Sequence, residues 1–145
     1  MHILIADDDA SCRQLLAALC KDSTSHQVVT VENGREAWAV LDDPNRWFDV
    51  VFLDISMPHW TGLEVLKRLR ASPLHRSVEV VMCTASNDRT TINQAIALGA
   101  KHYIVKPCTA RTVGAKLKQI EEQRVPSRPA RAICVSRRRP VRHAG

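Results

Sequence analysis

Short apolar runs alternate with amphipathic stretches along most of the chain. Five runs rich in β-branched residues have strand length, and each is followed by apolar residues at helical spacing. The expected strands are residues 3–6, 27–31, 48–54, 78–83 and 102–105. The expected helices cover residues 10–21, 33–43, 61–72, 88–99, and 109 through at least 120. The pattern therefore predicts five strands and five helices in strict alternation.

Polar residues at the expected helix ends support these boundaries. Asn33 with Glu36, and Thr61 with Glu64, have the three-residue spacing in which two side chains cap the first turn of a helix reciprocally. Gly99 can end the fourth helix in the left-handed conformation. These capping signals agree with the apolar periodicity about where the second and third helices begin and where the fourth helix ends.

Strict alternation of strands and helices predicts a parallel sheet with helices on both faces. In such sheets, ligands bind beyond the carboxyl ends of the strands. Polar residues at these ends are Asp7, Asp8, Asp54, Thr84 and Lys106. Two carboxylates about 4 Å apart repel by roughly 4 kcal/mol at an effective dielectric of 20, so three acids at one edge require a cation.

The longest largely apolar run begins at Phe48. Asp54 interrupts it, and Pro58 ends it. It predicts a buried central strand with a carboxylate where the chain leaves the core. Burying a charge is costly, so an acid there suggests a group kept for its charge or nucleophilicity. The run alone leaves a helix cap or a surface loop residue as alternatives.

Length and cysteine usage narrow the class of protein. At 145 residues the chain fits one domain with a sizeable core. Its five cysteines are odd in number and form no C-x-x-C pair, which argues against a disulfide framework or a zinc cluster. No run reaches the length of a membrane span, and acids at residues 7–9 interrupt any leader. We expect a cytoplasmic protein without a membrane span.

The positive charge is concentrated in the last part of the chain. The net charge is +6, and residues 121–145 contain seven arginines against two glutamates. Residues 1–120 are therefore close to neutral and show no global signature of nucleic-acid binding. We expect residues 124–145 to be a disordered tail, with a basic arm for an acidic partner, membrane surface or nucleic acid as the alternative. This tail is too short for a DNA-binding domain.

Four short motifs, each at the end of an expected strand, resemble the receiver domain of two-component response regulators. They are Asp7-Asp8, Asp54-x-x-Met57-Pro58-x-x-x-Gly62, Thr84-Ala85 and Lys106-Pro107. Each fragment is weak alone, but the order and the positions are specific. The resemblance covers about residues 2–120 and implies a receiver domain at residues 1–123. It also implies a doubly wound, flavodoxin-like sheet of order 2-1-3-4-5.

The resemblance assigns a role to each motif. It makes Asp54 the acceptor of a phosphoryl group from a phosphohistidine on a sensor histidine kinase. Asp8, Asp54 and the backbone carbonyl of Ser56 would hold Mg²⁺, a hard cation that prefers oxygen ligands, and Asp7 would act mostly through a bound water. Lys106 and Thr84 would bind phosphoryl oxygens. Ser56 and Ser86 would flank the path of the hydrolytic water.

A switch is also implied, in which Thr84 moves toward the phosphoryl group and Tyr103 turns inward. A core aromatic is the alternative reading of Tyr103. The resemblance further implies a cis bond between Lys106 and Pro107. Cys108 and the pair Trp60-Thr61 depart from the usual residues of the family.

The expected function is that of a stand-alone receiver that catalyses only its own phosphorylation and dephosphorylation. Its expected partners are a sensor histidine kinase and a downstream effector or histidine phosphotransferase, and its oligomeric state stays open, a phosphorylation-dependent dimer included. The main rival is a haloacid-dehalogenase-like phosphatase, because residues 3–11 approximate that family's strand and D-x-D-x-[ST] motif. It would make Asp7 the nucleophile and Asp9 the acid but leave Asp54 without a role. A receiver-like interaction module that has lost phosphorylation is the third possibility.

Overall fold

A computed structural model of the chain describes residues 1–21, 26–75, 77–85 and 89–124. Ten elements alternate along these residues. They are β1 (His2–Ala6), α1 (Ala10–Lys21), β2 (Gln27–Val31), α2 (Gly34–Leu41), β3 (Val50–Asp54), α3 (Gly62–Ala71), β4 (Glu79–Thr84), α4 (Arg89–Ala97), β5 (His102–Val105) and α5 (Ala110–Arg124). The expected five strands and five helices are confirmed, with most ends within two residues of the expected positions.

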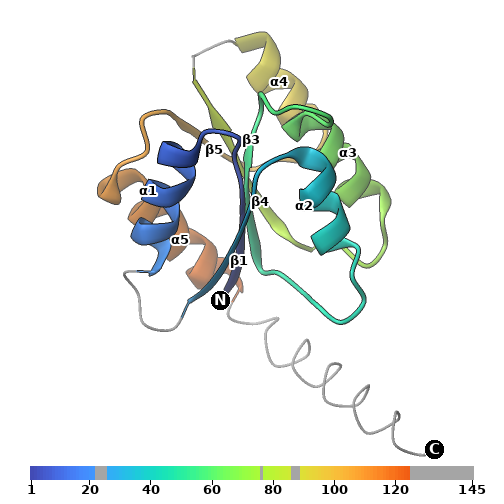
Figure 1. The fold of residues 1–145 in the computed structure, drawn as a ribbon, viewed down its shortest axis with the longest axis horizontal. Coiled ribbons are helices and arrows are strands. Elements are labelled where there is room, and N and C mark those ends of the chain that lie inside the picture. The colour runs from blue at the N-terminus through green and yellow to red at the C-terminus, as the bar shows by residue number, and fades with distance from the viewer. Residues whose placement is uncertain (22–25, 76, 86–88, 125–145) are drawn as a thin grey trace, which may run out of the picture. The chain divides into compact units, whose positions relative to one another are not determined.

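The five strands form one parallel sheet in the order β2-β1-β3-β4-β5. Figure 1 shows α1 on one face of this sheet and α2, α3 and α4 on the other. The doubly wound order 2-1-3-4-5 expected from the resemblance is therefore confirmed. Because β1 and β3 are adjacent in the middle of the sheet, the residues that follow them emerge side by side.

The central strand is buried along its whole length. All five residues of β3 are buried, as expected for a strand covered by helices on both faces. Alternate residues of β3 point to opposite faces of the sheet. Val51 and Leu53 belong to the apolar cluster that also contains residues of α2 and α3, whereas Val50 and Phe52 do not belong to it. The buried apolar pattern thus holds Asp54 at the end of a rigid strand.

The strand expected at residues 48–54 begins two residues later, at Val50. The reason is local, since Asp49 bonds across the start of the sheet. Its backbone N–H donates to the His2 carbonyl at 2.8 Å, and its side-chain Oδ2 accepts the His2 N–H at 2.9 Å. These bonds join β3 to β1 at the end of the sheet opposite Asp54.

The described residues fall into two compact units, Met1–Gly114 and, from Ala115 onward, the rest of α5. The sheet lies entirely within the first unit. No helix among the described residues is long and apolar enough to cross a membrane. Arg124, the first residue of the expected tail, ends α5, and residues 125–145 lie outside the described residues. The boundary after residue 123 therefore stays a prediction.

Candidate functional site

Three acids from two strand ends converge at the carboxyl edge of the sheet. Asp7 and Asp8 follow β1, and Asp54 ends β3, whose residue Leu53 pairs with Ala6 in register. One carboxylate oxygen from each acid lies within 4.8 Å of the others. Asp7 and Asp54 are buried, at 1% and 6% exposure, whereas Asp8 is exposed. An all-oxygen set open on one side suits a hydrated Mg²⁺.

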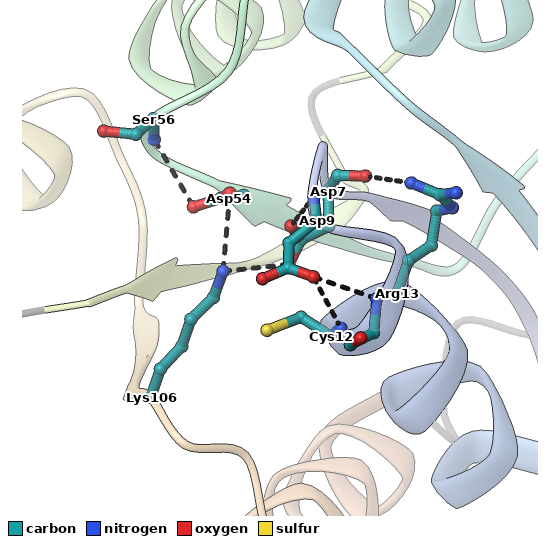
Figure 2. Close-up of polar contacts among 8 residues, drawn as sticks. Asp7, Asp9, Cys12, Arg13, Asp54, Ser56 and Lys106 are labelled. Atoms are coloured by element: carbon teal, nitrogen blue, oxygen red, sulfur yellow. Dashed lines mark hydrogen bonds and ion pairs between the residues drawn. The ribbon is translucent and has the colours of Figure 1, made fainter.

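Lys106 reaches this acid cluster from the end of β5. Its Nζ lies 2.9 Å from Asp7 Oδ2 and 3.4 Å from Asp54 Oδ2, and Figure 2 shows the ammonium between the two carboxylates. The Lys106 side chain is 15% exposed. One cation therefore faces two buried acids, which leaves the cluster with excess negative charge.

The pKa values reflect this excess. Burial and the charge of Asp7 raise the pKa of Asp54 to about 7, and Lys106 offsets only part of this shift. Burial disfavours the charged ammonium, but the hydrogen bond to Asp7 and the charges of Asp54 and Asp7 outweigh it and raise the pKa of Lys106. Lys106 lies closer to Asp7 than to Asp54. This explains why the Lys106 ammonium is well stabilised, whereas the ionised carboxylate of Asp54 is not. A second cation would complete the site.

The loop after β1 is held by bonds that the sequence patterns did not indicate. The Asp9 N–H donates to Asp7 Oδ1 at 2.9 Å, and the Asp9 carboxylate in turn accepts the Ser11 N–H at 2.9 Å. The Arg13 guanidinium donates to the Asp7 carbonyl at 2.8 Å. Figure 2 shows Arg13 on the side of Asp7 away from Lys106. The sequence gives one signal for this contact: Arg13 is a basic residue one turn into the helix that follows the acids.

The segment after Asp54 packs tightly against the start of α3. A Cβ at Gly62 would collide with the Asp54 carbonyl, so only glycine permits this approach. Met57 is buried at 7% exposure and belongs to the cluster under α2 and α3. The Ser56 N–H lies 3.4 Å from Asp54 Oδ1. The Asp54-x-x-Met57-Pro58-x-x-x-Gly62 spacing thus has a packing explanation.

Thr84 and Tyr103 meet in a pocket on the α4 side of the sheet. Thr84 ends β4 and is 6% exposed, while Tyr103 lies on β5 and is 46% exposed. Both line a small pocket whose other walls are mainly apolar. The remaining lining residues are Ile55, Met82, Ile92, Ala95, Ile96, Ala100 and His102. The structure therefore puts the two expected switch residues against a shared space.

The expected site residues occupy one edge of the sheet. Asp7, Asp8, Asp54 and Lys106 meet directly, and the Lys106 N–H donates to the Thr84 carbonyl at 2.7 Å. The Lys106–Pro107 bond is cis, as expected. The Ser56 carbonyl as a metal ligand stays a prediction. Ser86 and the first residue of the helix expected at 88–99 lie outside the described residues.

The carboxylate of Asp9 is used in a different way from that proposed by the phosphatase reading. It is exposed and caps the first turn of α1 through the N–H groups of Ser11 and Cys12. Together these backbone bonds hold the pKa of Asp9 below its ordinary value. Asp9 is therefore suited to hold the loop and poorly suited to donate a proton.

Comparisons with known proteins agree with this arrangement. Residues 3–118 match the model of the response regulator receiver domain family. A chemotaxis protein CheY homolog of Campylobacter jejuni is 29% identical over 120 residues, which cover 83% of this chain and 92% of that protein. The 3',5'-cyclic-nucleotide phosphodiesterase regA of Dictyostelium discoideum is 31% identical over 121 residues, but the match spans only 15% of it.

Solved structures show the same fold. The chemotaxis response regulator CheY4 of Vibrio cholerae has a TM-score of 0.74 and 29% identity, covering 82% of this chain and 97% of that one. The phosphorylated cyanobacterial phytochrome response regulator RcpA has a TM-score of 0.73 and 28% identity, covering 83% and 91%. The family match, the sheet order and the acid cluster lead to one conclusion: this chain belongs to the response regulator receiver domain family.

Proposed function

We propose that the domain accepts a phosphoryl group on Asp54 from the phosphohistidine of a sensor histidine kinase. The observation that carries the proposal is the meeting of Asp7, Asp8, Asp54 and Lys106 at the carboxyl edge of the sheet. A phosphorylated solved relative, RcpA, supports it. Asp54 Oδ would attack phosphorus, the phosphorus–nitrogen bond would break, and the phosphoryl group would pass to the carboxylate.

The nucleophile must be ionised, and the site makes this costly. Asp54 has a pKa of about 7 because it is buried beside Asp7. We propose that Asp7, Asp8, Asp54 and the Ser56 carbonyl hold Mg²⁺, which when bound would stabilise the ionised carboxylate and neutralise phosphoryl oxygens. Lys106 would bind another phosphoryl oxygen as a point charge, since its raised pKa keeps it protonated.

Thr84 and Tyr103 are proposed as the switch. Thr84 would hydrogen-bond the phosphoryl group, and Tyr103 would turn into the pocket that both residues line. Tyr103 is the only tyrosine of the chain, so fluorotyrosine NMR reports on it alone. Phosphorylation should lower its exposure to a soluble paramagnetic probe, and unchanged exposure would argue against this switch.

The proposal also covers where the domain acts and how it passes on its signal. The domain would act in the cytoplasm by phosphorylation-dependent binding of an effector, by dimerisation, or by relay to a histidine phosphotransferase. Matched relatives carry the domain both as nearly the whole protein and as a small part of it. The stand-alone arrangement therefore stays a prediction.

The test is phosphorylation of the full chain by acetyl phosphate and by a phosphorylated histidine kinase. We expect a mass gain of one phosphoryl group that requires Mg²⁺ and is lost in Asp54→Asn. Asp9→Asn is the matched control, because the side chain of Asp9 only caps α1 and should leave labelling intact. Label on another residue, or labelling unaffected by chelation of Mg²⁺, would contradict the proposal. Multiple-turnover phosphate release abolished by Asp7→Ala would favour the phosphatase.

Magnesium binding has a readout separate from phosphorylation. At ten times its dissociation constant, a ligand of the folded state adds about 1.4 kcal/mol to the free energy of unfolding. We therefore expect Mg²⁺ to raise the melting temperature by a few degrees. Asp54→Asn should weaken this increase, and a melting curve indifferent to Mg²⁺ would count against the metal site.

A further inference from the structure

The sheet has an open edge at β2, which takes no part in the proposed phosphorylation. β2 stands first in the strand order, and among the described strands it pairs with β1 alone. A free strand edge can pair with another strand, and natural proteins usually prevent this with lysine, proline or a bulge. The sequence of β2, QVVTV, contains no proline and no charged residue, and its register with β1 is continuous. Nothing within the strand therefore opposes further pairing.

The opposite edge of the sheet, β5, is better protected. It is 4 residues long against 5 in β2, and it stands between Lys101 and Lys106. Short length and neighbouring lysines are features by which edge strands avoid association. Of the two edges, β2 is therefore the one suited to a further strand.

The backbone groups that face the open edge belong to every second residue of β2. The N–H of Gln27 and the carbonyl of Val31 bond to the chain at the two ends of β1, at 2.9 and 3.2 Å. In a parallel pair, alternate residues direct both of their backbone groups to the same neighbour. The N–H and carbonyl groups of Val28 and Thr30 therefore point away from β1.

These outward groups fix how a second copy of the chain aligns. Antiparallel strands bond where two opposite residues exchange both backbone hydrogen bonds. Val28 can do so with Thr30 of a second copy, and Thr30 can do so with Val28 of that copy. This register has a two-fold axis at Val29, so the same edge serves both chains. Val29 is partly buried and meets its own counterpart in the close pair that has no hydrogen bonds.

The charged groups beside β2 favour the same register. His26 directly precedes the strand, and its Nδ1 lies 3.1 Å from the N-terminal ammonium of Met1. Glu32 directly follows the strand and is exposed, and its N–H donates to the Glu36 carboxylate at 3.0 Å. Antiparallel alignment about Val29 brings residue 26 opposite residue 32, because each is equally far from Val29 along the chain. The basic end of each strand then meets the acidic end of the other.

We propose that two copies of the domain associate through β2, paired antiparallel about Val29 in one continuous sheet. The edge is self-complementary in its hydrogen bonds and in its charges, as a two-fold interface requires. Because short strands bury little area, the dimer is weak and depends on concentration. The inference does not rest on the proposed phosphorylation, since β1 separates β2 from Asp54 on β3.

The experiment measures the mass of the full chain by sedimentation equilibrium from micromolar to millimolar concentration. We expect the average mass to rise from that of one chain toward that of two. Thr30→Pro removes an outward N–H but no bond to β1, and proline is tolerated on edge strands. It should weaken association by about tenfold or more. Thr30→Val keeps the N–H and is the matched control, and circular dichroism verifies that both variants fold.

Charge reversal tests the register without changing the backbone. Glu32→Lys brings basic groups together across the interface, and His26→Glu brings acids together, so each should weaken association. The double variant exchanges the two charges and should recover the association that the single variants lose. Glu121→Lys, at an exposed position of α5, is the charge-matched control and should change little.

Cross-linking tests the two-fold axis. Under mild oxidation, Val29→Cys should form a disulfide between copies that joins the tryptic peptide 22–35 to itself. Gln27→Cys should not form this product, because its counterpart in the second copy lies about 13 Å further along the strand.

The outcomes decide between this edge and other arrangements. A chain that stays monomeric throughout the concentration range overturns the proposal and leaves an extended segment of a different protein as the candidate occupant of the edge. A dimer that is unaffected by Thr30→Pro and by the single charge reversals lies on another surface and overturns it equally. Labelling of Asp54 is a separate readout, so its failure would count against the proposed function and leave the dimer to the sedimentation result.

Discussion

Asp49 precedes the buried strand β3 and Asp54 ends it, yet the two carboxylates have different surroundings. Asp49 is 0% exposed and bonds to both backbone groups of His2, at 2.8 and 2.9 Å. Asp54 receives one long N–H contact from Ser56, at 3.4 Å, and faces Asp7. A backbone N–H of the neighbouring strand donates to the first carboxylate and stabilises it, whereas a neighbouring acid opposes ionisation of the second.

The difference separates a structural acid, Asp49, from the proposed phosphoacceptor, Asp54. A buried carboxylate that accepts backbone N–H groups ties elements together and gains stability from them. A buried carboxylate held among like charges lowers stability in the absence of a cation, and such groups cluster at functional sites. Burial alone therefore does not identify the proposed phosphoacceptor, because both acids are buried.

Alanine at each acid is the strongest test of this comparison. Asp54→Ala should abolish phosphorylation completely and leave the free energy of unfolding at neutral pH unchanged or higher, because the opposed charge is gone. Asp49→Ala should keep phosphorylation but lower the free energy of unfolding by about 2 kcal/mol, because the His2 N–H loses its acceptor. Urea unfolding and acetyl phosphate labelling measure both. Equal loss of stability in the two variants would erase the distinction.

Removal of the cation should affect the Asp54 end strongly. Lys106→Met leaves Asp7 and Asp54 buried without their ammonium partner and should cost about 3 kcal/mol in the absence of Mg²⁺. Mg²⁺ should return part of this loss. Lys101→Met, at an exposed position, is the control and should change little. Thermal and urea unfolding with and without Mg²⁺ would show the effect, and equal losses in both variants would contradict it.

The pH dependence of stability should come from Asp54. Its pKa rises from 3.8 to about 7 on folding, so the protonated form is favoured in the folded state. Its contribution to stability is present below about pH 4 and is lost as pH rises toward 7, by about 1.4 kcal/mol per pH unit at the steepest point. The difference between Asp54→Asn and the unaltered chain, both without Mg²⁺, isolates this loss. A difference that does not change between pH 4 and 7 would refute the assignment.

The smallest expected effect concerns the loop that presents Asp7. Arg13→Ala removes the bond to the Asp7 carbonyl and should weaken Mg²⁺ binding by about fivefold, the equivalent of one hydrogen bond of about 1 kcal/mol. Arg46→Ala removes an exposed ion pair with Asp43, in the segment between α2 and β3, and serves as the control. Calorimetric titration with Mg²⁺ measures both affinities, and equal values in the two variants would remove Arg13 from the site.

Much of the fold and of the candidate site can be predicted from the sequence. Apolar runs of strand length and apolar residues at helical spacing predict the alternation of elements, because burial requires these two periods. Acids and a lysine directly after strands predict that Asp7, Asp8, Asp54 and Lys106 share one edge, because parallel strands end at the same edge. The family resemblance supplied the sheet order, which local patterns do not contain.

Tertiary structure alone decided which groups are in contact. The sequence presents Asp49 and Asp54 as similar acids at the two ends of one apolar run, and only the neighbouring strands distinguish them. The same holds for Arg13, whose guanidinium reaches the Asp7 carbonyl only because folding places the two groups side by side. Periodicity depends on a residue's own burial, whereas a hydrogen bond or a pKa depends on the atoms that folding places beside it.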